Sequence, residues 1–272
     1  MAITLEEAKK NVQDDLQMGV IDEFQKSNFI LEHIPFDDAV SPTGGGATPS
    51  YSYTRLKTQP TAEFREINKE YTSAEVTKER HTVEIKVFGG SYEIDRVIAN
   101  MGGIVSEVEL QQAQKIKAAQ ALFNDTFING DTAKDTKAFD GLDKALTGSS
   151  TEYNTEGSID LSTSELVTKN YQYFLDMLDE FLGGLDGTPT FIAGNNKLIS
   201  KLRACARRAS MYQVTQDNWG NQVESYGGVP FVDLKTKPGT NDEVVPIKGD
   251  DGTTSLYVAR LAMDGLHAVS FA

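Results

Sequence analysis

The chain has 272 residues, of which 39% are hydrophobic and 24% are charged. This length supports a substantial core, in one elaborate domain or two small ones. The formal net charge of -14 at pH 7 argues against a free-standing nucleic-acid-binding protein, because such a protein needs a basic face. Cys205 is the only cysteine, so an intrachain disulfide is excluded and a reducing compartment fits. The acidic N-terminus and the lack of a long apolar run indicate neither a secretory signal nor a membrane helix, so we expect a cytoplasmic site of synthesis.

The N-terminal region divides into three predicted segments. Apolar residues at helical spacing predict an amphipathic helix over residues 4–27. The following FILEHIPF segment, residues 29–36, is predicted to be extended because Pro35 disfavours helix before it. The SPTGGGATP segment then places Gly44, Gly45 and Gly46 between two prolines, which predicts a hinge. These glycines lack the lysine that follows in a phosphate-binding loop.

Residues 51–95 change to a period of two, which predicts strands. Alternating Val83, Ile85 and Val87 predict a half-buried strand, with YSYTRLK and AEFREIN as its partners. Between residues 46 and 100 there are eight basic and eight acidic side chains, whereas the first 45 residues carry three basic and nine acidic ones. Such a charge-balanced ribbon suggests pairing with another surface, although the residues alone favour a solvated hairpin. The charged residues that we expect at such a contact are Arg55, Lys57, Arg65, Glu66, Lys69, Glu70, Lys78 and Arg80.

The strongest predicted helix spans residues 106–129. Its apolar residues recur at steps of three and four, as in one stripe of a helix: Leu110, Ala113, Ile116, Ala119, Phe123 and Phe127. At 1.5 Å per residue the helix would be roughly 36 Å long, which suits a spine across a flat molecule or an ordinary bundle helix.

The segment FINGDTAKDTKAFDGL, residues 127–142, carries the aspartates that most resemble a cation site. Asp131, Asp135 and Asp140 are spaced four and five residues apart, whereas a calcium loop needs donors at alternating positions. Gly130 and Gly141 are interpreted as breakers that end the helix and turn the chain, through their tolerance of positive φ. One question stays open, namely whether neighbouring copies of this loop share a cation through Asp131 or Asp135.

The C-terminal half reads as a mixture of helices and strands. Ser162 and Glu165 predict the capped start of a helix that ends at Gly183 and Gly184. TPTFIA, GVPFVDL and TSLYVARL predict strands, and NNKLISKLRACARRA predicts a helix. This order indicates an α+β or mixed α/β region.

The chain is poor in residues for catalysis or metal binding. His33, His81 and His267 lie far apart in sequence, with no second ligand at zinc spacing. Cys205 lies among small apolar residues and is interpreted as a buried thiol. The basic residues of the same helix are interpreted as a solvated face, with a phosphate or an acidic partner as the alternative: Lys197, Lys201, Arg203, Arg207 and Arg208.

The order of these parts resembles the major capsid protein of tailed bacteriophages, which has the Hong Kong 97-type shell fold. An arm, a glycine hinge and a charged hairpin lead through GGSYEID to a long helix that ends in FINGD, with FDGL, YGGVPFV and YVARLAMDGLHAVS in order behind it. The resemblance covers essentially the whole chain. It implies an α+β fold with an N-terminal arm (1–45), an extended E-loop hairpin (46–92), a P-domain with a spine helix (93–157), an A-domain (158–262) and a return towards the P-domain (263–272).

The function that the resemblance implies is structural rather than enzymatic and needs no cofactor. The chain would assemble with itself into hexamers and pentamers of an icosahedral shell around double-stranded DNA, without sequence-specific binding and without a membrane. A separate scaffolding protein, a portal protein and decoration proteins would be its partners, and the virion, assembled in the host cytoplasm, its location. Some members of the family cross-link an E-loop lysine, for which Lys57, Lys69 and Lys78 qualify by position, although ordinary ion pairs are the simpler expectation. The alternatives are an encapsulin-type compartment shell or a cation-binding enzyme or module that uses the acidic loop.

Overall fold

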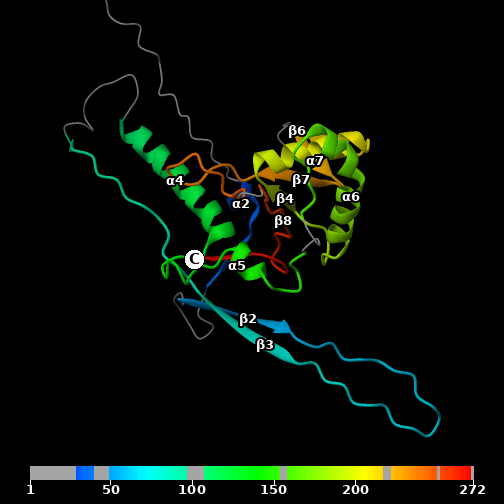
Figure 1. The fold of residues 1–272 in the computed structure, drawn as a ribbon. Coiled ribbons are helices and arrows are strands. Elements are labelled where there is room, and N and C mark those ends of the chain that lie inside the picture. The colour runs from blue at the N-terminus through cyan, green and yellow to red at the C-terminus, as the bar shows by residue number, and fades with distance from the viewer. Residues whose placement is uncertain are drawn as a thin grey trace, which may run out of the picture.

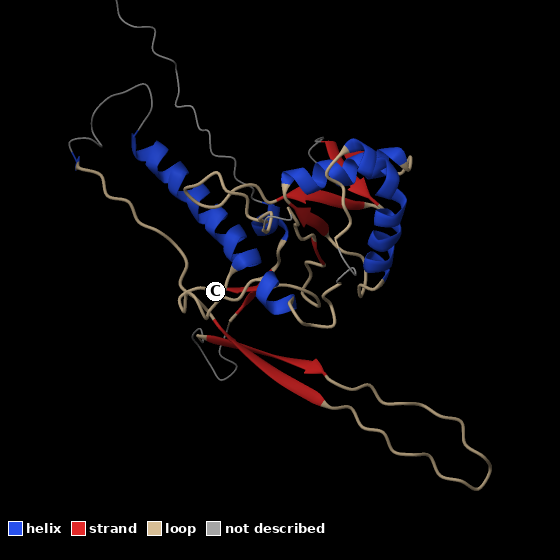
Figure 2. Ribbon diagram, in the orientation of Figure 1, coloured by secondary structure: helices blue, strands red, loops and turns tan. Residues whose placement is uncertain are grey.

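The structure is a computed structural model that describes residues 29–39, 49–96, 107–153, 158–216, 222–249 and 252–270. The predicted helix at 4–27 and the hinge at Gly44–Gly46 lie outside the described residues. Figures 1 and 2 show a body of helices and strands, a long helix beside it and a two-stranded ribbon that extends away from it.

The body is organised around a five-stranded mixed sheet with the strand order β5-β6-β7-β4-β8. Its strands are β4 (Phe191–Gly194), β5 (Gln213–Gln216), β6 (Gln222–Tyr226), β7 (Val229–Asp233) and β8 (Tyr257–Ala259). Only the central β4 and β7 pair in parallel, and the other neighbours are antiparallel. All four residues of β4 are buried, as expected for a central strand that is covered on both faces.

One face of the sheet is covered by α6 (Ser164–Gly183) and α7 (Asn196–Arg208). Ile192 of β4 packs in this cluster with apolar residues of both helices. The hydroxyl of Thr163 accepts a hydrogen bond from the Leu166 amide, so the predicted cap at Ser162 is wrong by one residue. Gly184 follows the last turn of α6, as predicted.

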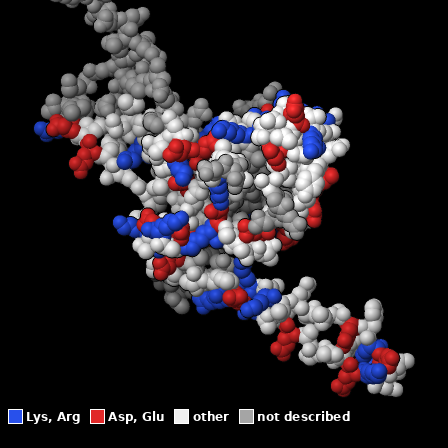
Figure 3. Space-filling model, viewed as in Figure 1, with Lys and Arg blue, Asp and Glu red and all other residues white. Residues whose placement is uncertain are grey.

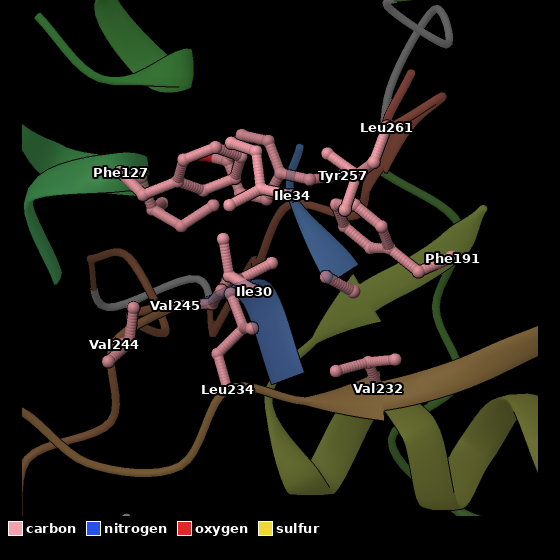
Figure 4. Packing of buried hydrophobic residues seen from close by; sticks show 12 residues of the cluster. Ile30, Ile34, Phe127, Phe191, Val232, Leu234, Val244, Val245, Tyr257 and Leu261 are labelled. Carbon is pink, nitrogen blue, oxygen red and sulfur yellow. The ribbon is translucent and has the colours of Figure 1, made fainter. Parts of the chain in front are cut away.

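The opposite face carries a second apolar cluster, in which Phe191 and Ala193 of β4 take part because side chains alternate along a strand. Figure 4 shows Ile30 and Ile34 in this cluster, close to Phe127 at the end of the long helix. Ile30 belongs to the short helix α2 (Phe29–His33), so the prediction of an extended segment is wrong there. The restriction from Pro35 acts on the residue before it, and burial of Ile30 favours a helical turn upstream.

The long helix α4 (Glu107–Asn129) confirms the helix predicted at 106–129. Its C-terminal end packs into the second cluster through Phe127 and Ile128, and its N-terminal part extends away from the body (Figure 1). The predicted apolar stripe is therefore buried only in part, and Ile116 remains 51% exposed. The short helix α5 (Leu142–Leu146) lies at the end of α4 (Figure 1).

Two smaller sheets complete the described part of the chain. Strand β1 (Phe36–Asp38) pairs in parallel with β9 (Ala268–Ser270), so segments from opposite ends of the sequence meet. Strands β2 (Ser50–Leu56) and β3 (Lys78–Glu84) form the antiparallel ribbon. The strand predicted at AEFREIN is wrong, because residues 62–68 lie in the loop beyond this ribbon and not in the ladder.

Candidate intersubunit surfaces

The β2–β3 ribbon is a two-stranded element that extends away from the body. Its register pairs Tyr53 with His81, and the hydroxyls of Ser52 and Thr82 lie 2.9 Å apart across the strands. The Lys57 amide donates to the Thr77 carbonyl at 2.8 Å, where the ladder ends. An isolated two-stranded ribbon is only marginally stable in water, so its backbone pairing alone does not explain its length.

The root of the ribbon is fixed to the β1–β9 sheet. The Tyr51 hydroxyl donates to a carboxylate oxygen of Asp37 at 2.8 Å, and this bond raises the pKa of Tyr51. The ring of Tyr51 also meets that of His267 edge to face, with centroids 6.0 Å apart. The root is thus held by Asp37 of β1 and by His267, which directly precedes β9.

Most side chains along the ribbon are exposed. Val83 is 44% exposed and Val87 is 98% exposed, whereas Ile85 is half-buried, so the predicted burial of alternate residues is confirmed only at Ile85. The alternating pattern predicts a strand with one covered face, but the described part of this chain does not supply a surface that covers the exposed valines.

The charges of the ribbon, balanced overall, are segregated along its length. The stem, residues 49–58 and 76–88, carries five bases and two acids, a net charge of +3. The tip, residues 59–75, carries two bases and four acids, a net charge of -2. Figure 3 shows basic side chains gathered near the stem, and mixed charges at the far end.

The predicted contact residues fall into two groups in the structure. Arg65, Glu66 and Lys69 come together at the tip. The remaining stem residues line the ladder, where Arg55 stands opposite Glu79, Arg80 opposite Thr54, and Lys78 opposite Leu56. Lys57 lies 4.0 Å from Glu79 and Lys69 lies 2.6 Å from Glu66, so two of the three cross-link candidates have an acidic partner within their own chain. Glu70 lies in the exposed tip.

The junction loop, residues 130–144, gathers charges around one ammonium group. Lys144 Nζ lies 2.7 Å from Asp131 Oδ1 and 2.8 Å from Asp140 Oδ1. The hydrogen bond from Lys144 is the largest cause that lowers the pKa of both carboxyls, to about 2 for Asp140. The Asp135 carboxylate instead accepts from the Lys137 amide at 3.0 Å. Two of the three aspartates therefore face a cation of the chain itself.

Gly130 directly follows α4 and Gly141 directly precedes α5, as the prediction of a helix end and a turn requires, but the reason for glycine differs from the predicted one. Neither is among the glycines with positive φ, and the Gly141 amide donates to the Gly130 carbonyl at 2.8 Å. A Cβ at Gly130 would lie 2.2 Å from the Phe139 carbonyl oxygen, and one at Gly141 would lie 2.5 Å from the Ile128 carbonyl oxygen. The two glycines allow the close approach of two backbone segments. The predicted end of the helix before Gly130 is confirmed, but its explanation by a positive φ is wrong.

The sequence itself matches no family model and no curated protein. The structure, however, resembles a chain of the holo-SrpI encapsulin complex from Synechococcus elongatus PCC 7942, with a TM-score of 0.62 and 13% identity, over 100% of this chain and 79% of that chain. A structure from Mycobacterium phage Bobi gives a TM-score of 0.56 and 13% identity over 96% and 78% of the two chains. A chain of the capsid of a native GTA particle gives a TM-score of 0.53 and 11% identity, over 94% of this chain and 80% of that chain. These are shell proteins of one fold.

The chain has the Hong Kong 97-type capsid fold. The resemblance that the sequence suggested is confirmed at the level of the fold, together with its α+β class. The similar structures come from shells and not from enzymes. At these identities of 11–13%, the likeness is one of fold.

Cys205 and three basic residues of α7 have structural roles. Cys205 is fully buried, and burial raises the pKa of its thiol. Three bases of α7 fasten the helix to its surroundings: Arg203 pairs with Glu224, Lys201 donates to the Ser162 carbonyl, and Arg208 donates to Thr168. Within the described ranges, no group of three His, Cys, Asp or Glu side chains is placed to hold a metal ion, and no helix is long and apolar enough to cross a membrane.

Proposed function

We propose that this chain is the major capsid protein of a tailed bacteriophage, a subunit that assembles with copies of itself into an icosahedral shell. The observation that carries the proposal is the β2–β3 ribbon. It extends from a well-packed body, exposes most of its apolar side chains and, among the described residues, is anchored at its root. A monomer gains little from such an element, whereas a shell subunit uses it against a neighbour.

The family's division of the chain is part of the proposal. Residues 1–45 are the N-terminal arm, 46–92 the E-loop, 93–157 the P-domain with α4 as its spine, 158–262 the A-domain and 263–272 the return to the P-domain. The extended ribbon supports the second assignment, and the five-stranded sheet with α6 and α7 supports the fourth. The parallel pairing of β9 with β1 supports a return of the chain to its beginning.

The partners follow from this role. Copies of the chain form hexamers and pentamers, a separate scaffolding protein guides them, and a portal protein and decoration proteins complete the head. The shell encloses double-stranded DNA without reading its sequence, which agrees with a net charge of -14. The protein is located in the virion, after assembly in the host cytoplasm.

A compartment shell of the encapsulin type is the second candidate. It is favoured by the TM-score of 0.62 to the encapsulin chain, over the whole of this chain. The ribbon and the spine helix serve either kind of shell, so the contents of the particle decide between them.

The cation-binding alternative has less support. Asp131 and Asp140 both direct a carboxylate oxygen at Lys144, which occupies the place of a cation. An ion shared through Asp131 would have to displace this ammonium.

The test is to purify particles from the natural source, treat them with nuclease and analyse what remains inside. A tailed-phage capsid protects double-stranded DNA of uniform length and carries a portal. Protection of a cargo enzyme without DNA supports the compartment instead. A chain that is recovered only as single subunits contradicts both.

A further inference from the structure

The β7–β8 loop, residues 235–248, connects the five-stranded sheet to α4. Figure 1 shows this loop in orange, reaching from the sheet towards α4. At its centre lies the dipeptide Val244–Val245, whose side chains are 0% and 1% exposed. Figure 4 shows both valines in the apolar cluster that also contains Phe127 of α4 and Leu234. The loop therefore belongs to the core that joins α4 to the sheet.

The two valine carbonyls accept hydrogen bonds from asparagine side chains of two different helices. The Asn129 amide, at the end of α4, donates to the Val244 carbonyl at 2.7 Å. The Asn195 amide, directly before α7, donates to the Val245 carbonyl at 3.3 Å. Asn195 is only 2% exposed, and its side-chain oxygen caps α7. Because a buried carbonyl that loses its partner is costly, these bonds fix consecutive residues of the loop to α4 and to α7.

Two lysines of the loop form ion pairs with α4 and α5. Lys237 Nζ lies 3.7 Å from Asp125 Oδ1 of α4, and Lys248 Nζ lies 3.4 Å from Asp143 Oδ1 of α5. All four side chains are partly exposed, so each pair contributes little to the stability of the fold. The two lysines lie on either side of the valine pair in the sequence. Together they fix the orientation of the loop on α4 and α5.

The first residue of the loop, Lys235, has a left-handed backbone with a φ of 60°. Asp233 accepts a hydrogen bond from the Lys235 amide at 2.8 Å, and its carboxylate lies 3.1 Å from the ammonium of the same lysine. The Lys235 carbonyl accepts from the Val244 amide at 2.9 Å. Strain of this kind persists only where the surrounding structure determines the conformation. The path of the loop is therefore also fixed where it leaves β7.

We infer that the β7–β8 loop fixes the angle between α4 and the five-stranded sheet, and that this angle sets the curvature of the particle that the chain forms. Asn129, Lys237 and Lys248 act as positioning residues within the subunit. The inference rests on the proposed shell function and goes beyond it, because it names an internal element that controls how subunits meet.

The length of α4 makes the angle at its end important. This helix extends away from the body, whereas α6 and α7 cover the sheet (Figure 1). A rotation of about 5° at the end of α4 would displace its other end by about 3 Å, since a helix of 23 residues is about 35 Å long. Contacts between copies repeat the same rotation, which decides whether rings and shells close. A subunit that builds particles of one size therefore needs a fixed angle at this joint.

The first experiment removes the two ion pairs of the loop with K237A/K248A. In unassembled subunits, the Val244 amide should exchange its hydrogen about tenfold faster than in the unchanged chain, because exchange follows local opening and the pairs oppose it. The melting temperature should change little, since exposed pairs contribute little to global stability. At assembly, electron microscopy should show closed particles of more than one diameter, or open and irregular assemblies, where the unchanged chain gives closed particles of one diameter.

The matched control for this variant is K201A/R208A. It removes the same number of positive charges, but the bonds that are lost, to Ser162 and Thr168, join α7 to α6 and the segment before it. Exchange at Val244 and the particle diameter should both stay as in the unchanged chain. An equal spread of diameters in the control overturns the inference. Loss of all assembly by folded K237A/K248A would place the two lysines at a contact between subunits and would also overturn it.

The second experiment removes the buried bond from α4 with N129D, which puts a carboxylate of nearly the same shape where the amide donates. The control is N170D, because the Asn170 amide likewise donates to a carbonyl, that of Asp160, at 2.8 Å, away from the β7–β8 loop. Only N129D should give particles of mixed diameter. If N129D fails to fold, the exposed pair K237A/K248A decides the question. Uniform particles of the unchanged diameter from K237A/K248A, or from folded N129D, overturn the inference and leave the shell function intact. An unchanged chain that forms no particles overturns both.

Discussion

The ribbon tip (59–75) and the junction loop (130–144) are both charged turns, but they treat their apolar residues in opposite ways. In the junction loop, Phe139 lies against Phe123 with ring centroids 5.8 Å apart, and Leu142 packs on the body cluster. In the tip, Phe64 and Ile67 project outwards. The charged residues of both turns form local hydrogen bonds and ion pairs, so charge alone does not distinguish the two turns. They differ in whether their apolar side chains are packed within the chain or exposed.

The largest effect is expected from the junction loop, with G130A. The new Cβ would meet the carbonyl oxygens of Phe139 and Thr126 at 2.2 and 2.5 Å, and backbone atoms cannot move away as side chains do. We expect a loss of about 3 kcal/mol in the free energy of unfolding, at the upper end for overpacking. Urea denaturation of unassembled subunits, followed by circular dichroism, measures it.

The control for this prediction is G183A, at the end of α6. A Cβ there meets nothing within 4 Å, and alanine favours helix over glycine by about 0.5–1 kcal/mol. The variant should be at least as stable as the unchanged chain. If G130A were equally stable, the close backbone approach at the junction would be refuted.

A smaller effect is expected where the junction meets the sheet, with Y257F. The Tyr257 hydroxyl donates to Asp143 of α5 at 2.8 Å, and burial raises the pKa of the tyrosine, followed by this bond. Loss of the bond should cost about 1 kcal/mol of unfolding free energy, with assembly unaffected. Thermal denaturation measures the first quantity, and particle yield the second. A loss of particles without a loss of stability would show that Tyr257 contributes to an interface between subunits and not to the stability of the fold.

A still smaller, pH-dependent effect is expected from K144M. The folded pKa of Asp140 lies at about 2, below its ordinary value of 3.8. The bond to Lys144 therefore stabilises the fold fully when the pH is above about 3.8, and this stabilisation is lost as the pH falls towards 2. The unchanged chain should lose this stability between about pH 4 and 2, and K144M should lose less over that window. Because both partners are largely solvated, the difference is modest. Identical acid-unfolding curves would show that the Lys144 cluster contributes nothing measurable.

The smallest effect on stability is expected in the ribbon, from the double reversal R65E/E66R. Its partners are exposed, so the free energy of unfolding should change by less than about 0.5 kcal/mol. Assembly should weaken, because Arg65 loses its hydrogen bond to the Lys69 carbonyl and its contact with the Tyr71 ring, which shape the exposed tip. A titration of particle yield against protein concentration measures the effect. Unchanged assembly would show that the charged residues of the tip are not needed between subunits.

Much of the body could be predicted from sequence because its apolar patterns correspond to burial. The capped amphipathic α6 buries Val167, Leu175 and Leu178, and the apolar run of β4 is buried at all four residues, whereas the stripe of α4 is buried only at its end, at Phe127. The hairpin β5–β6 was missed, since the polar sequences QVTQ and QVESY carry no strong strand signal. Its pairing is set by tertiary contact with β7.

The surfaces could be predicted only in part. The alternation at Val83 and Val87 predicts strand but does not say that the covering surface is absent from the described chain. Likewise, the sequence points to Gly130 and Gly141 as special positions. It does not show that the carbonyl oxygens of Phe139 and Ile128 lie too close to them for a side chain. Phe64 and Ile67 resembled ordinary strand residues until the structure placed them at an exposed tip.

The most direct test of the shell proposal is the mass of the purified, unchanged chain in solution. A single chain has a mass of 29.8 kDa. Sedimentation velocity at increasing concentration, with negative-stain electron microscopy of the same samples, should show a cooperative transition to one large species that appears as closed, hollow particles. A single species of the monomer mass at every concentration, without particles, would contradict the account.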